Sequence, residues 1–346
     1  MKKVLFINLV TYSQTGGIEN YNKNIIKSLP RGSDVVSIYD KNNENISTIN
    51  FYNFNGNKLG AMFFILKNIY KYNSVISSHI NLLPILIIMK ILKPNLNVFL
   101  AAHGIEAWKE FNFIKRLFLN KIIIMPVSNY TKNMMIKLNN LSENNFKLLF
   151  NCIDMNIKTD FDNIYNNNNF NILSVTRLDK NDNYKGIDCM IKTIPLLIKT
   201  IPNLKYTIIG KGDDKERLEQ LTKDLNVEKY IDFKGFVEYI EPYYQYCDVF
   251  TLPSKGEGFG IVYIEAMKYK KPCIACDEGG QTDVVLHNKT GFLCDYNNVE
   301  CLQNSIIKLY KDNKKRELFG QNGYYHLVEN FTFDKFKERL RKIIDE

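Results

Sequence analysis

Two kinds of segment alternate regularly along the chain. Short apolar runs alternate with longer amphipathic segments from one end of the sequence to the other. This order is typical of parallel sheets built from successive β-α-β units. We therefore predict an α/β fold in which parallel strands are covered by amphipathic helices.

The alternation is interrupted once, by a polar and Asn-rich segment at residues 160–169 that we interpret as a linker. Strands are predicted on both sides of it, over residues 4–9, 35–39, 75–78, 98–101, 122–127 and 147–150, then 172–175, 205–209, 231–233, 249–252 and 272–275. Helices are predicted between them, for example over residues 18–28, 82–92, 108–119 and 188–200. Two successive Rossmann-like domains are the simplest interpretation.

The length of 346 residues, 45% of them apolar, also exceeds one ordinary domain. We predict an N-terminal domain over residues 1–160, a second domain over 161–330, and a C-terminal helix over 331–346 that packs back on the N-terminal domain. Sheets of this kind bind ligands at the carboxyl ends of their strands. Functional residues are therefore expected just after the apolar runs.

Three sequence features indicate in which cellular compartment the protein is expected. The apolar segment 74–89 is interrupted by Ser77, Ser78 and Pro84 and is shorter than the roughly 18 to 20 residues that a spanning helix needs, so no integral membrane protein is expected. The N-terminus leads directly into a predicted strand without a small-residue cleavage site, which favours a cytoplasmic protein over a secreted one. The seven cysteines are odd in number and lie mostly in apolar contexts, which predicts reduced thiols.

Charge is unevenly distributed. Residues 1–168 contain 19 Lys and Arg against 10 Asp and Glu, whereas residues 169–346 contain 27 of each kind. The excess suggests an anionic partner for the first half, such as a phosphate-bearing substrate or an anionic membrane. The alternative is a purely compositional excess of solvated lysines. We expect no nucleic acid, because no nucleic-acid-binding motif is present and the aromatic residues follow core spacing.

The densest group of candidate functional residues lies between Pro253 and Met267. Three glycines, Gly256, Gly258 and Gly260, alternate directly before a predicted helix. Backbone N–H groups can then approach a ligand closely, and the start of the helix favours negative charge, so the pattern predicts a phosphate site. Glu257 and Glu265, about two helical turns apart, could accept hydrogen bonds from sugar hydroxyls.

Two cations complete this candidate site. Arg177 follows a predicted strand and Lys185 precedes the next predicted helix, so both belong to the same end of the second sheet. Together they could neutralise a diphosphate without a metal ion. The alternative for each is a surface salt bridge.

These motifs resemble a known family. Arg177-Leu178-Asp179, Tyr184-Lys185-Gly186, Gly210-Lys211-Gly212-Asp213 and the Glu257-x7-Glu265 motif are similar, in order and spacing, to the donor domain of retaining glycosyltransferases of family 4, which have the GT-B fold. The resemblance extends over nearly the whole chain and includes Gly16-Gly17-Ile18-Glu19, His103-Gly104-Ile105-Glu106, Val127-Ser128-Asn129-Tyr130-Thr131 and Asn151-Cys152-Ile153-Asp154, in which Cys152 replaces the usual glycine. It implies two Rossmann-like domains with parallel sheets that face each other across a cleft.

The resemblance also implies roles for the matching residues. The catalytic residues would be His103, Arg177, Lys185 and Glu257, with His103 beside the donor sugar. The donor-binding residues would be Gly16, Gly17, Arg177, Lys185, Phe236, Val237, Glu257, Phe259, Gly260, Ile261 and Glu265. Arg177 and Lys185 would bind the diphosphate and Glu265 the ribose, and the base would lie near Phe236 and Val237.

The reaction implied is the retaining transfer of a sugar from a nucleotide-diphosphate sugar, with UDP favoured over GDP, to a hydroxyl of a glycan or lipid-linked acceptor, as in bacterial surface polysaccharide assembly. We expect no cofactor, since the nucleotide sugar is a substrate, and no metal. The single Asp-x-Asp sequence, Asp160 to Asp162, falls in the linker, and Cys273-Ile274-Ala275-Cys276 lies on a predicted buried strand. Glu257 is expected to orient the sugar instead of attacking it.

The segment 108–125 combines large apolar residues with Lys109, Lys115, Arg116 and Lys121. It predicts peripheral binding to the inner face of an anionic membrane, where a lipid-linked acceptor would lie. The alternative is an ordinary helix that covers a sheet.

Two other functions remain open. A nucleotide-sugar epimerase of the same architecture would convert the donor without an acceptor, and an inactive protein would bind the nucleotide sugar without consuming it.

Overall fold

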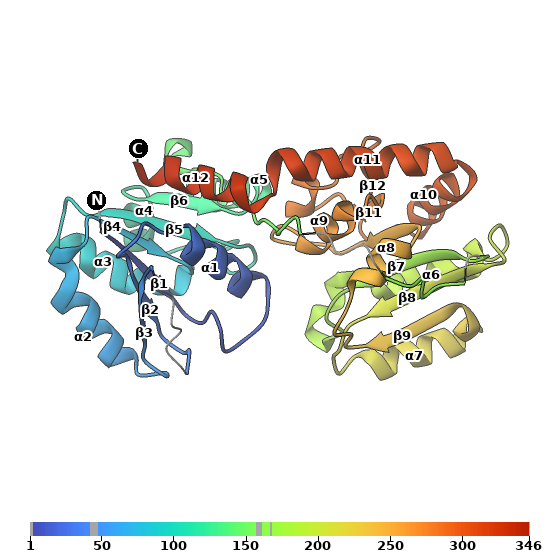
Figure 1. Cartoon of the computed structure of the whole chain (residues 1–346), viewed down its shortest axis with the longest axis horizontal. Coiled ribbons are helices and arrows are strands. Elements are labelled where there is room, and N and C mark those ends of the chain that lie inside the picture. Colours follow the sequence, from blue (N-terminus) through green and yellow to red (C-terminus); the bar gives the residue numbers. More distant parts are fainter. Residues whose placement is uncertain (1–2, 42–47, 157–160, 167, 346) are drawn as a thin grey trace. The chain divides into compact units, whose positions relative to one another are not determined.

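A computed structural model describes residues 3–41, 48–156, 161–166 and 168–345 (Figure 1). The chain divides into two compact units. The N-terminal unit comprises Met1–Cys152 together with Phe333–Glu346, and the C-terminal unit comprises Ile153–Thr332. Each unit contains one parallel sheet with its own helices.

The sheet of the N-terminal unit has six parallel strands in the order β3-β2-β1-β4-β5-β6. They are β1 (Val4–Asn8), β2 (Asp34–Ser37), β3 (Asn50–Asn53), β4 (Ser74–Ser77), β5 (Asn97–Ala102) and β6 (Ile123–Pro126). Most of their residues are buried because helices cover both faces of a parallel sheet. The strand order reverses between β1 and β4, so this point is a topological switch point, where such sheets bind ligands.

The described residues of this unit form six α-helices. They are α1 (Gly17–Ser28), α2 (Lys58–Asn68), α3 (Leu83–Leu92), α4 (Phe113–Leu119), α5 (Asn129–Asn139) and α12 (Phe333–Asp345). Helices α2, α3 and α4 contribute to one apolar core cluster, for example through Ile65, Leu86 and Phe118. Helix α12 packs against α1, where the rings of Tyr21 and Phe336 meet edge to face at 5.3 Å.

The C-terminal unit repeats this topology with the order β12-β11-β10-β7-β8-β9. Its strands are β7 (Phe170–Val175), β8 (Leu204–Ile209), β9 (Ile231–Gly235), β10 (Val249–Leu252), β11 (Cys273–Cys276) and β12 (Gly291–Cys294). Its helices are α6 (Ile187–Leu197), α7 (Lys215–Asp224), α8 (Glu241–Tyr246), α9 (Ile261–Lys268), α10 (Val299–Lys311) and α11 (Asn313–Asn330). Its switch point therefore lies between β7 and β10.

Some predicted elements are wrong. The helix predicted from residue 108 begins only at Phe113, because the side chain of Asn112 accepts a hydrogen bond from the N–H of Lys115 at 3.0 Å and caps the helix there. Residues 147–150 form no strand, although Phe146 makes a single bridge to Ile124. Strands β3 and β12 and helix α2 were not predicted.

The cysteines are not all reduced thiols. Cys294 and Cys301 form a disulfide that joins the end of β12 to the first turn of α10, with Cα atoms 5.7 Å apart. The expectation of reduced thiols is therefore wrong for this pair. Cys273 and Cys276 are free and buried on β11, as predicted for core thiols.

Among the described residues, no helix combines the length and the apolar character that crossing a bilayer requires.

Candidate active site

The switch point of the C-terminal unit brings the predicted charged residues together. The carboxyl end of β7 leads to Arg177 and, through a short 3-10 segment (Lys180–Lys185), to Lys185. The neighbouring strand β10 leads to the loop that contains Glu257. Two segments far apart in sequence thus meet because β7 and β10 are paired in parallel.

Lys185 and Glu257 form a largely buried ion pair. The distance between Lys185 Nζ and Glu257 Oε1 is 2.7 Å, and the side chains are only 14% and 15% exposed. Burial acts to lower the pKa of Lys185, but Glu257, Tyr184 and Asp182 together act in the opposite direction and the pKa is raised. Burial acts to raise the pKa of Glu257, but Lys185, Ser254 and Arg177 together act in the opposite direction and the pKa is lowered. Both groups are therefore charged at neutral pH.

Arg177 lies at the solvent side of this pair. Its side chain is 74% exposed, and its Nη2 atom lies 2.9 Å from the carboxylate of Asp182. It also contributes to the lowered pKa of Glu257, so the three charged groups are neighbours. An exposed guanidinium beside a buried ion pair offers planar donors to an incoming phosphate.

Close backbone contacts hold the segment that carries Lys185 against the end of β10. Gly186 has a φ of 74°, and a Cβ atom at this position would lie 2.3 Å from the carbonyl oxygen of Pro253. The N–H of Lys255 donates to the carbonyl oxygen of Tyr184 at 2.8 Å. The segment that carries Lys185 can therefore pack on the end of β10 only because residue 186 is glycine.

The loop before α9 has the geometry expected of a glycine-rich turn. Gly256 and Gly260 have φ values of 82° and 90°, and α9 begins directly after Gly260. The amide nitrogen of the Gln281 side chain donates to the carbonyl oxygens of Ser254, at 3.0 Å, and Glu278, at 2.9 Å. Gln281 thus fixes this loop, and no sequence motif pointed to this role.

Glu265 lies on α9, and its carboxylate accepts a hydrogen bond from the hydroxyl of Tyr244 at 2.8 Å. Burial raises the pKa of Glu265, although the hydrogen bond from Tyr244 acts in the opposite direction. A carboxylate with one donor retains acceptor capacity for a hydroxyl group.

The remaining predicted donor residues have different environments. The ring of Phe236 is 69% exposed, with Lys211 Nζ 4.8 Å from its centroid, and Val237 beside it is half-buried. Phe259 is buried with its ring against Phe331 at 5.3 Å. Its side chain is therefore part of the core, and only its backbone could meet a ligand. Ile261 is half-buried in the first turn of α9.

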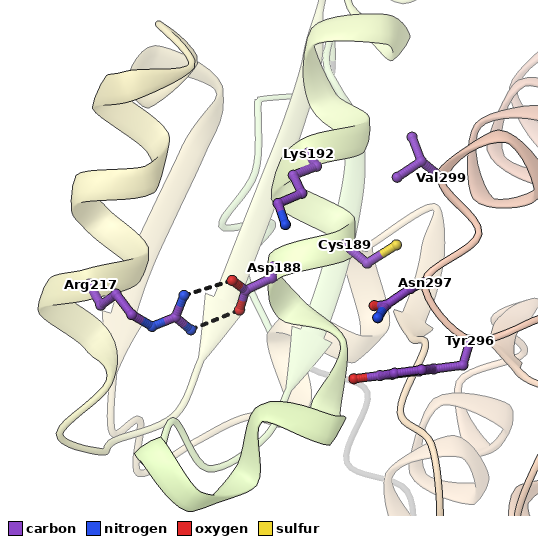
Figure 2. A pocket seen from close by; sticks show the side chains of 7 residues that line it. All are labelled: Asp188, Cys189, Lys192, Arg217, Tyr296, Asn297 and Val299. Carbon is purple, nitrogen blue, oxygen red and sulfur yellow. Dashed lines mark hydrogen bonds and ion pairs between the residues drawn. The ribbon is translucent and has the colours of Figure 1, made fainter.

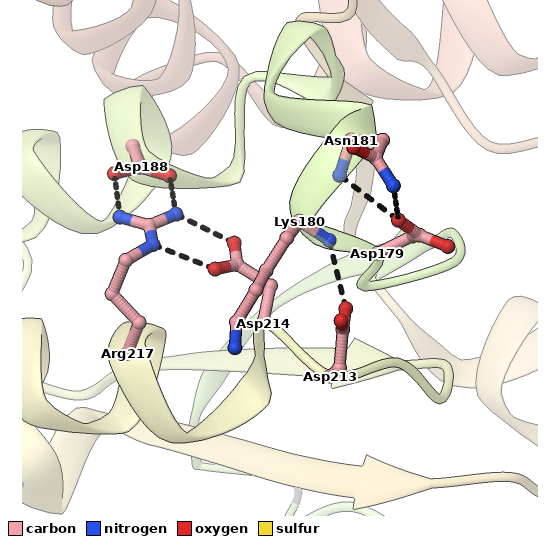
Figure 3. A network of polar contacts seen from close by, with 7 residues as sticks. All are labelled: Asp179, Lys180, Asn181, Asp188, Asp213, Asp214 and Arg217. Atoms are coloured by element: carbon pink, nitrogen blue, oxygen red, sulfur yellow. Dashed lines mark hydrogen bonds and ion pairs between the residues drawn. The ribbon is translucent and has the colours of Figure 1, made fainter.

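A polar network links α6, α7 and the segment that leads to Lys185 (Figure 3). The guanidinium of Arg217 donates to Asp188 at 2.6 and 2.8 Å and to Asp214 at 2.6 Å. The carboxylate of Asp213 accepts from the N–H of Lys180 at 2.9 Å. This network positions the backbone before Lys185, and its only sequence signal is the Gly210–Asp213 turn.

A cavity of about 510 Å³ lies next to this network (Figure 2). Asp188, Cys189 and Lys192 of α6 form one side of it, and Tyr296 and Asn297 from the loop after β12 form the other. None of the predicted donor residues lines it. The cavity therefore gives no support to their assignment.

In the N-terminal unit, the predicted glycines follow β1. Gly17 is the first residue of α1. The preceding loop is held by Asp40, whose carboxylate accepts the N–H groups of Thr11, Tyr12 and Ser13 at 2.9, 2.8 and 2.8 Å. Burial acts to raise the pKa of Asp40, but the hydrogen bonds from Ser37 and this loop lower it. Asp40 was not predicted, although an acidic residue directly after an apolar strand was a possible signal.

His103 follows β5 in the same unit. Its Nε2 atom lies 2.8 Å from the carbonyl oxygen of Ser78, and its ring meets that of Tyr21 edge to face at 4.8 Å. Burial lowers the pKa of His103, so the ring is neutral at pH 7. Because a carbonyl only accepts, Nε2 carries the proton and Nδ1 remains an acceptor. Glu106 accepts the backbone N–H of His103 at 2.6 Å and fixes this turn.

Among the residues that the structure describes, no three His, Cys, Asp or Glu side chains gather in a way that could hold a metal ion. Asp160 of the Asp-x-Asp sequence lies outside the described residues.

The chain is similar to known glycosyltransferases. Residues 156–326 match the family described as Glycosyl transferases group 1. The uncharacterized glycosyltransferase MJ1178 of Methanocaldococcus jannaschii is 27% identical over 97% of this chain and 96% of its own. An uncharacterized glycosyltransferase of Haemophilus influenzae is 30% identical over 172 residues, and the match covers 47% of this chain and about half, 48%, of that relative.

The fold is also that of a solved glycosyltransferase from Rickettsia africae ESF-5, which superposes with a TM-score of 0.79 over 99% of this chain and 97% of that chain, at 17% identity. The crystal structure of Anabaena Alr3699/HepE in complex with UDP superposes with a TM-score of 0.84 over 99% of both chains, at 19% identity. The predicted α/β fold class of the GT-B type is therefore confirmed.

Proposed function

Since the chain belongs to the glycosyl transferases group 1, we propose that it transfers a sugar from a nucleotide-diphosphate sugar to a hydroxyl group, with retention of configuration. The observation that carries the proposal is the buried Lys185–Glu257 ion pair at the switch point between β7 and β10. UDP is the favoured nucleotide, supported by the UDP in the similar Anabaena structure, and GDP is the alternative.

The main catalytic contribution is stabilisation of the leaving group. In the transfer, the acceptor oxygen forms a bond to the anomeric carbon while the bond from that carbon to the diphosphate breaks. The acceptor proton leaves with the diphosphate. Negative charge then builds on the diphosphate, where Arg177, Lys185 and the amides at the start of α9 stabilise it more strongly than in the ground state. These groups take the place of a divalent ion.

Glu257 orients the donor sugar. The ion pair with Lys185 keeps its carboxylate ionised, so Glu257 accepts hydrogen bonds from sugar hydroxyls instead of donating a proton. His103 accepts a hydrogen bond from a substrate hydroxyl through Nδ1 of its neutral ring. Gly16 and Gly17 let the backbone before α1 approach a ligand closely.

The nucleoside occupies the remaining positions. Glu265 accepts hydrogen bonds from the ribose hydroxyls. The exposed ring of Phe236 stacks on the base, and Val237 contacts the base beside it. Replacing Glu265 by Gln removes one charge-assisted hydrogen bond and should weaken nucleotide affinity about tenfold. Isothermal titration with UDP measures this, and an unchanged dissociation constant would contradict the ribose assignment.

The acceptor is a glycan or a lipid-linked molecule reached at an anionic membrane. This proposal rests on the N-terminal unit, in which residues 48–105 contain no Asp or Glu. Helix α4 exposes Phe113, Ile114 and Leu117 by 65%, 66% and 49%, with Lys115 and Arg116 among them. Exposed apolar and basic residues on one short helix suit an anionic lipid interface.

Two assays test the proposed function. A thermal-shift screen with UDP, GDP and ADP sugars identifies the donor, because a ligand that binds only the folded state stabilises it. Donor consumption with and without added acceptor then separates the candidates. Transfer that requires the acceptor supports a glycosyltransferase, conversion without acceptor indicates an epimerase, and binding without consumption indicates an inactive protein.

A further inference from the structure

One disulfide ties a strand of the C-terminal unit to the helix that follows it. Cys294 ends β12 and Cys301 lies in the first turn of α10, seven positions later in the sequence. The five other cysteines, all within the described residues, form no disulfide. A bond that closes so short a loop contributes less stability than one that closes a long loop. Stability alone therefore explains this pair poorly.

The disulfide can be reached from solvent on the side of Cys301. Cys301 lines a cavity of about 370 Å³, and His287, Glu300 and Lys308 on the walls of this cavity are exposed. Cys294, by contrast, is only 1% exposed. Because thiol–disulfide exchange requires access to a sulfur atom, an incoming thiolate would attack Cys301 and release Cys294.

The buried sulfur has a neighbour that suits a leaving thiolate. Cys294 Sγ lies 3.5 Å from the hydroxyl oxygen of Ser305 on α10. A hydroxyl can donate a hydrogen bond, and hydrogen bonds to charged acceptors are stronger than those to neutral ones. Ser305 would therefore stabilise Cys294 as it leaves.

Backbone hydrogen bonds connect this pair to the glycine-rich loop before α9. The N–H of Asp277 donates to the carbonyl oxygen of Cys294 at 3.0 Å. The next residue, Glu278, accepts the N–H of Gly256 at 2.9 Å through its carbonyl oxygen. Gly256 directly precedes Glu257, so a movement at the end of β12 reaches the loop of Glu257 through two hydrogen bonds.

Two carboxylates oppose each other at the point where β11 and β12 end. Asp277 follows β11 and Asp295 follows β12, and the two strands pair in parallel with Cys276 opposite Cys294. Burial raises the pKa of Asp277, and the charge of Asp295 raises it further. This unfavourable contact is relieved if residues 295–298 move away from β11, and the disulfide restrains that movement.

We propose that the Cys294–Cys301 disulfide is a redox switch that a dithiol reductant opens, and that its opening loosens the loop of Glu257. One thiolate of the reductant forms a bond to Cys301 Sγ, while the bond between the two cysteines breaks and Cys294 leaves as a thiolate. The second thiolate of the reductant then displaces Cys301, and the reductant becomes a disulfide. Two electrons pass to the cysteine pair, which also takes up the two protons that the reductant loses.

The first measurement counts thiols in the full-length chain. The folded protein is treated briefly with dithiothreitol or left untreated, then unfolded, alkylated with a maleimide and analysed by mass spectrometry. We expect five alkylated cysteines without reductant and seven after it, with Cys294 and Cys301 as the difference. Seven alkylated cysteines without reductant, or a pair that is reduced only after unfolding in urea, would overturn the proposal.

Amide hydrogen exchange then measures the coupling. The N–H groups of Lys255 and Gly256 should exchange about tenfold faster in the reduced protein, while those of β8 stay unchanged. The double variant Cys294→Ser/Cys301→Ser should exchange like the reduced protein with or without dithiothreitol. Cys152→Ala is the matched control, because it removes a cysteine of the other unit that forms no disulfide, and it should respond to dithiothreitol like the unmodified chain.

Equal exchange at Lys255 and Gly256 in the oxidised and reduced unmodified chain would overturn the coupling, and this comparison needs no variant. A double variant that still responds to dithiothreitol would show that another group is the switch. Neither measurement uses a nucleotide or a sugar, so the result does not depend on the proposed function.

Discussion

The two units have the same strand order but very different side chains. The N-terminal unit contains 23 Lys and Arg against 11 Asp and Glu, whereas the C-terminal unit contains 23 against 26. Of the 18 exposed large apolar side chains among the described residues, 12 belong to the N-terminal unit. The shared topology therefore fixes where ligands can bind, while the side chains determine which partner each unit takes.

In the C-terminal unit, the charged side chains near the candidate site form ion pairs. Lys185 and Glu257 neutralise each other in a buried position, and Arg217 bridges Asp188 and Asp214. In the N-terminal unit, by contrast, basic residues outnumber acidic ones, by 23 to 11. We infer that the C-terminal unit is organised for one precise ligand and the N-terminal unit for anionic surfaces and groups.

The largest expected effect is that of Lys185→Ala, which removes the cation proposed to bind the diphosphate. We expect kcat/KM to fall about 1000-fold, because an interaction with the leaving group in the transition state is lost. The free energy of unfolding should fall by about 3 kcal/mol, since Glu257 is left buried without its partner. Steady-state kinetics and urea denaturation measure the two effects.

Lys255→Ala is the matched control for this variant. Its ammonium lies 3.3 Å from Glu278, and both side chains are about half exposed. Such surface pairs contribute little to stability. Equal losses in the two lysine variants would remove the special role of the buried pair.

Glu257→Ala should separate turnover from nucleotide affinity. We expect kcat to fall about 100-fold while the dissociation constant for UDP changes less, because Glu257 contacts the sugar and not the nucleotide. Initial rates and calorimetry measure this difference. A loss of UDP affinity as large as the loss of kcat would instead place Glu257 at the diphosphate.

The same ion pair predicts a pH dependence of stability. The pKa of Glu257 is lowered on folding, so its contribution is present above the ordinary value of about 4.3 and is lost as pH falls through the folded value. The pKa of Lys185 is raised, so its contribution is present below about 10.4 and is lost as pH rises through the folded value. Urea denaturation should therefore give a constant contribution from this pair between about pH 5 and 9, measured against Lys185→Met. A steep change within that interval would contradict the assignment.

Asp40→Ala tests the corresponding loop of the N-terminal unit. It leaves the N–H groups of Thr11, Tyr12 and Ser13 without their acceptor, so we expect this unit to lose about 2 kcal/mol of stability. UDP affinity should be reduced much less than in Lys185→Ala. Differential scanning calorimetry with and without UDP measures both, and an unchanged melting temperature would show that Asp40 does not hold this loop.

The smallest effect is expected at the surface of α4. Phe113→Ser removes one apolar side chain that is 65% exposed, so co-sedimentation with anionic vesicles should weaken a few-fold while stability is unchanged. Tyr325→Ser is the control, because Tyr325 is 57% exposed on the C-terminal unit. If both variants lose the same amount of binding, the N-terminal unit has no special affinity for membranes.

The sequence predicted the fold class because its periodic apolar runs are long and frequent. It missed β3 and β12 because both are short strands at the edges of their sheets, and β3 contains only two apolar residues. The disulfide could not be predicted, because only the folded turn between β12 and α10 brings Cys294 and Cys301 together.

For the candidate site, the sequence identified the charged residues but not what holds them. Arg177, Lys185 and Glu257 lie in recognisable motifs, and the structure brings them together. Gln281, Arg217 and Asp40 act through long-range hydrogen bonds to backbone and side-chain groups. Such contacts depend on tertiary packing, so the weak signals at Asp40 and at the Gly210–Asp213 turn did not identify these contacts.

The most direct test of the central claim is calorimetric titration of UDP into the unmodified chain and into Lys185→Ala, with EDTA present in both. The claim is that fixed cations at the end of β7 and β10 bind the diphosphate without a metal ion. It predicts that the unmodified chain binds UDP in EDTA and that Lys185→Ala binds about 100-fold more weakly. Equal affinity of the two proteins, or binding that EDTA abolishes and magnesium restores, would contradict it.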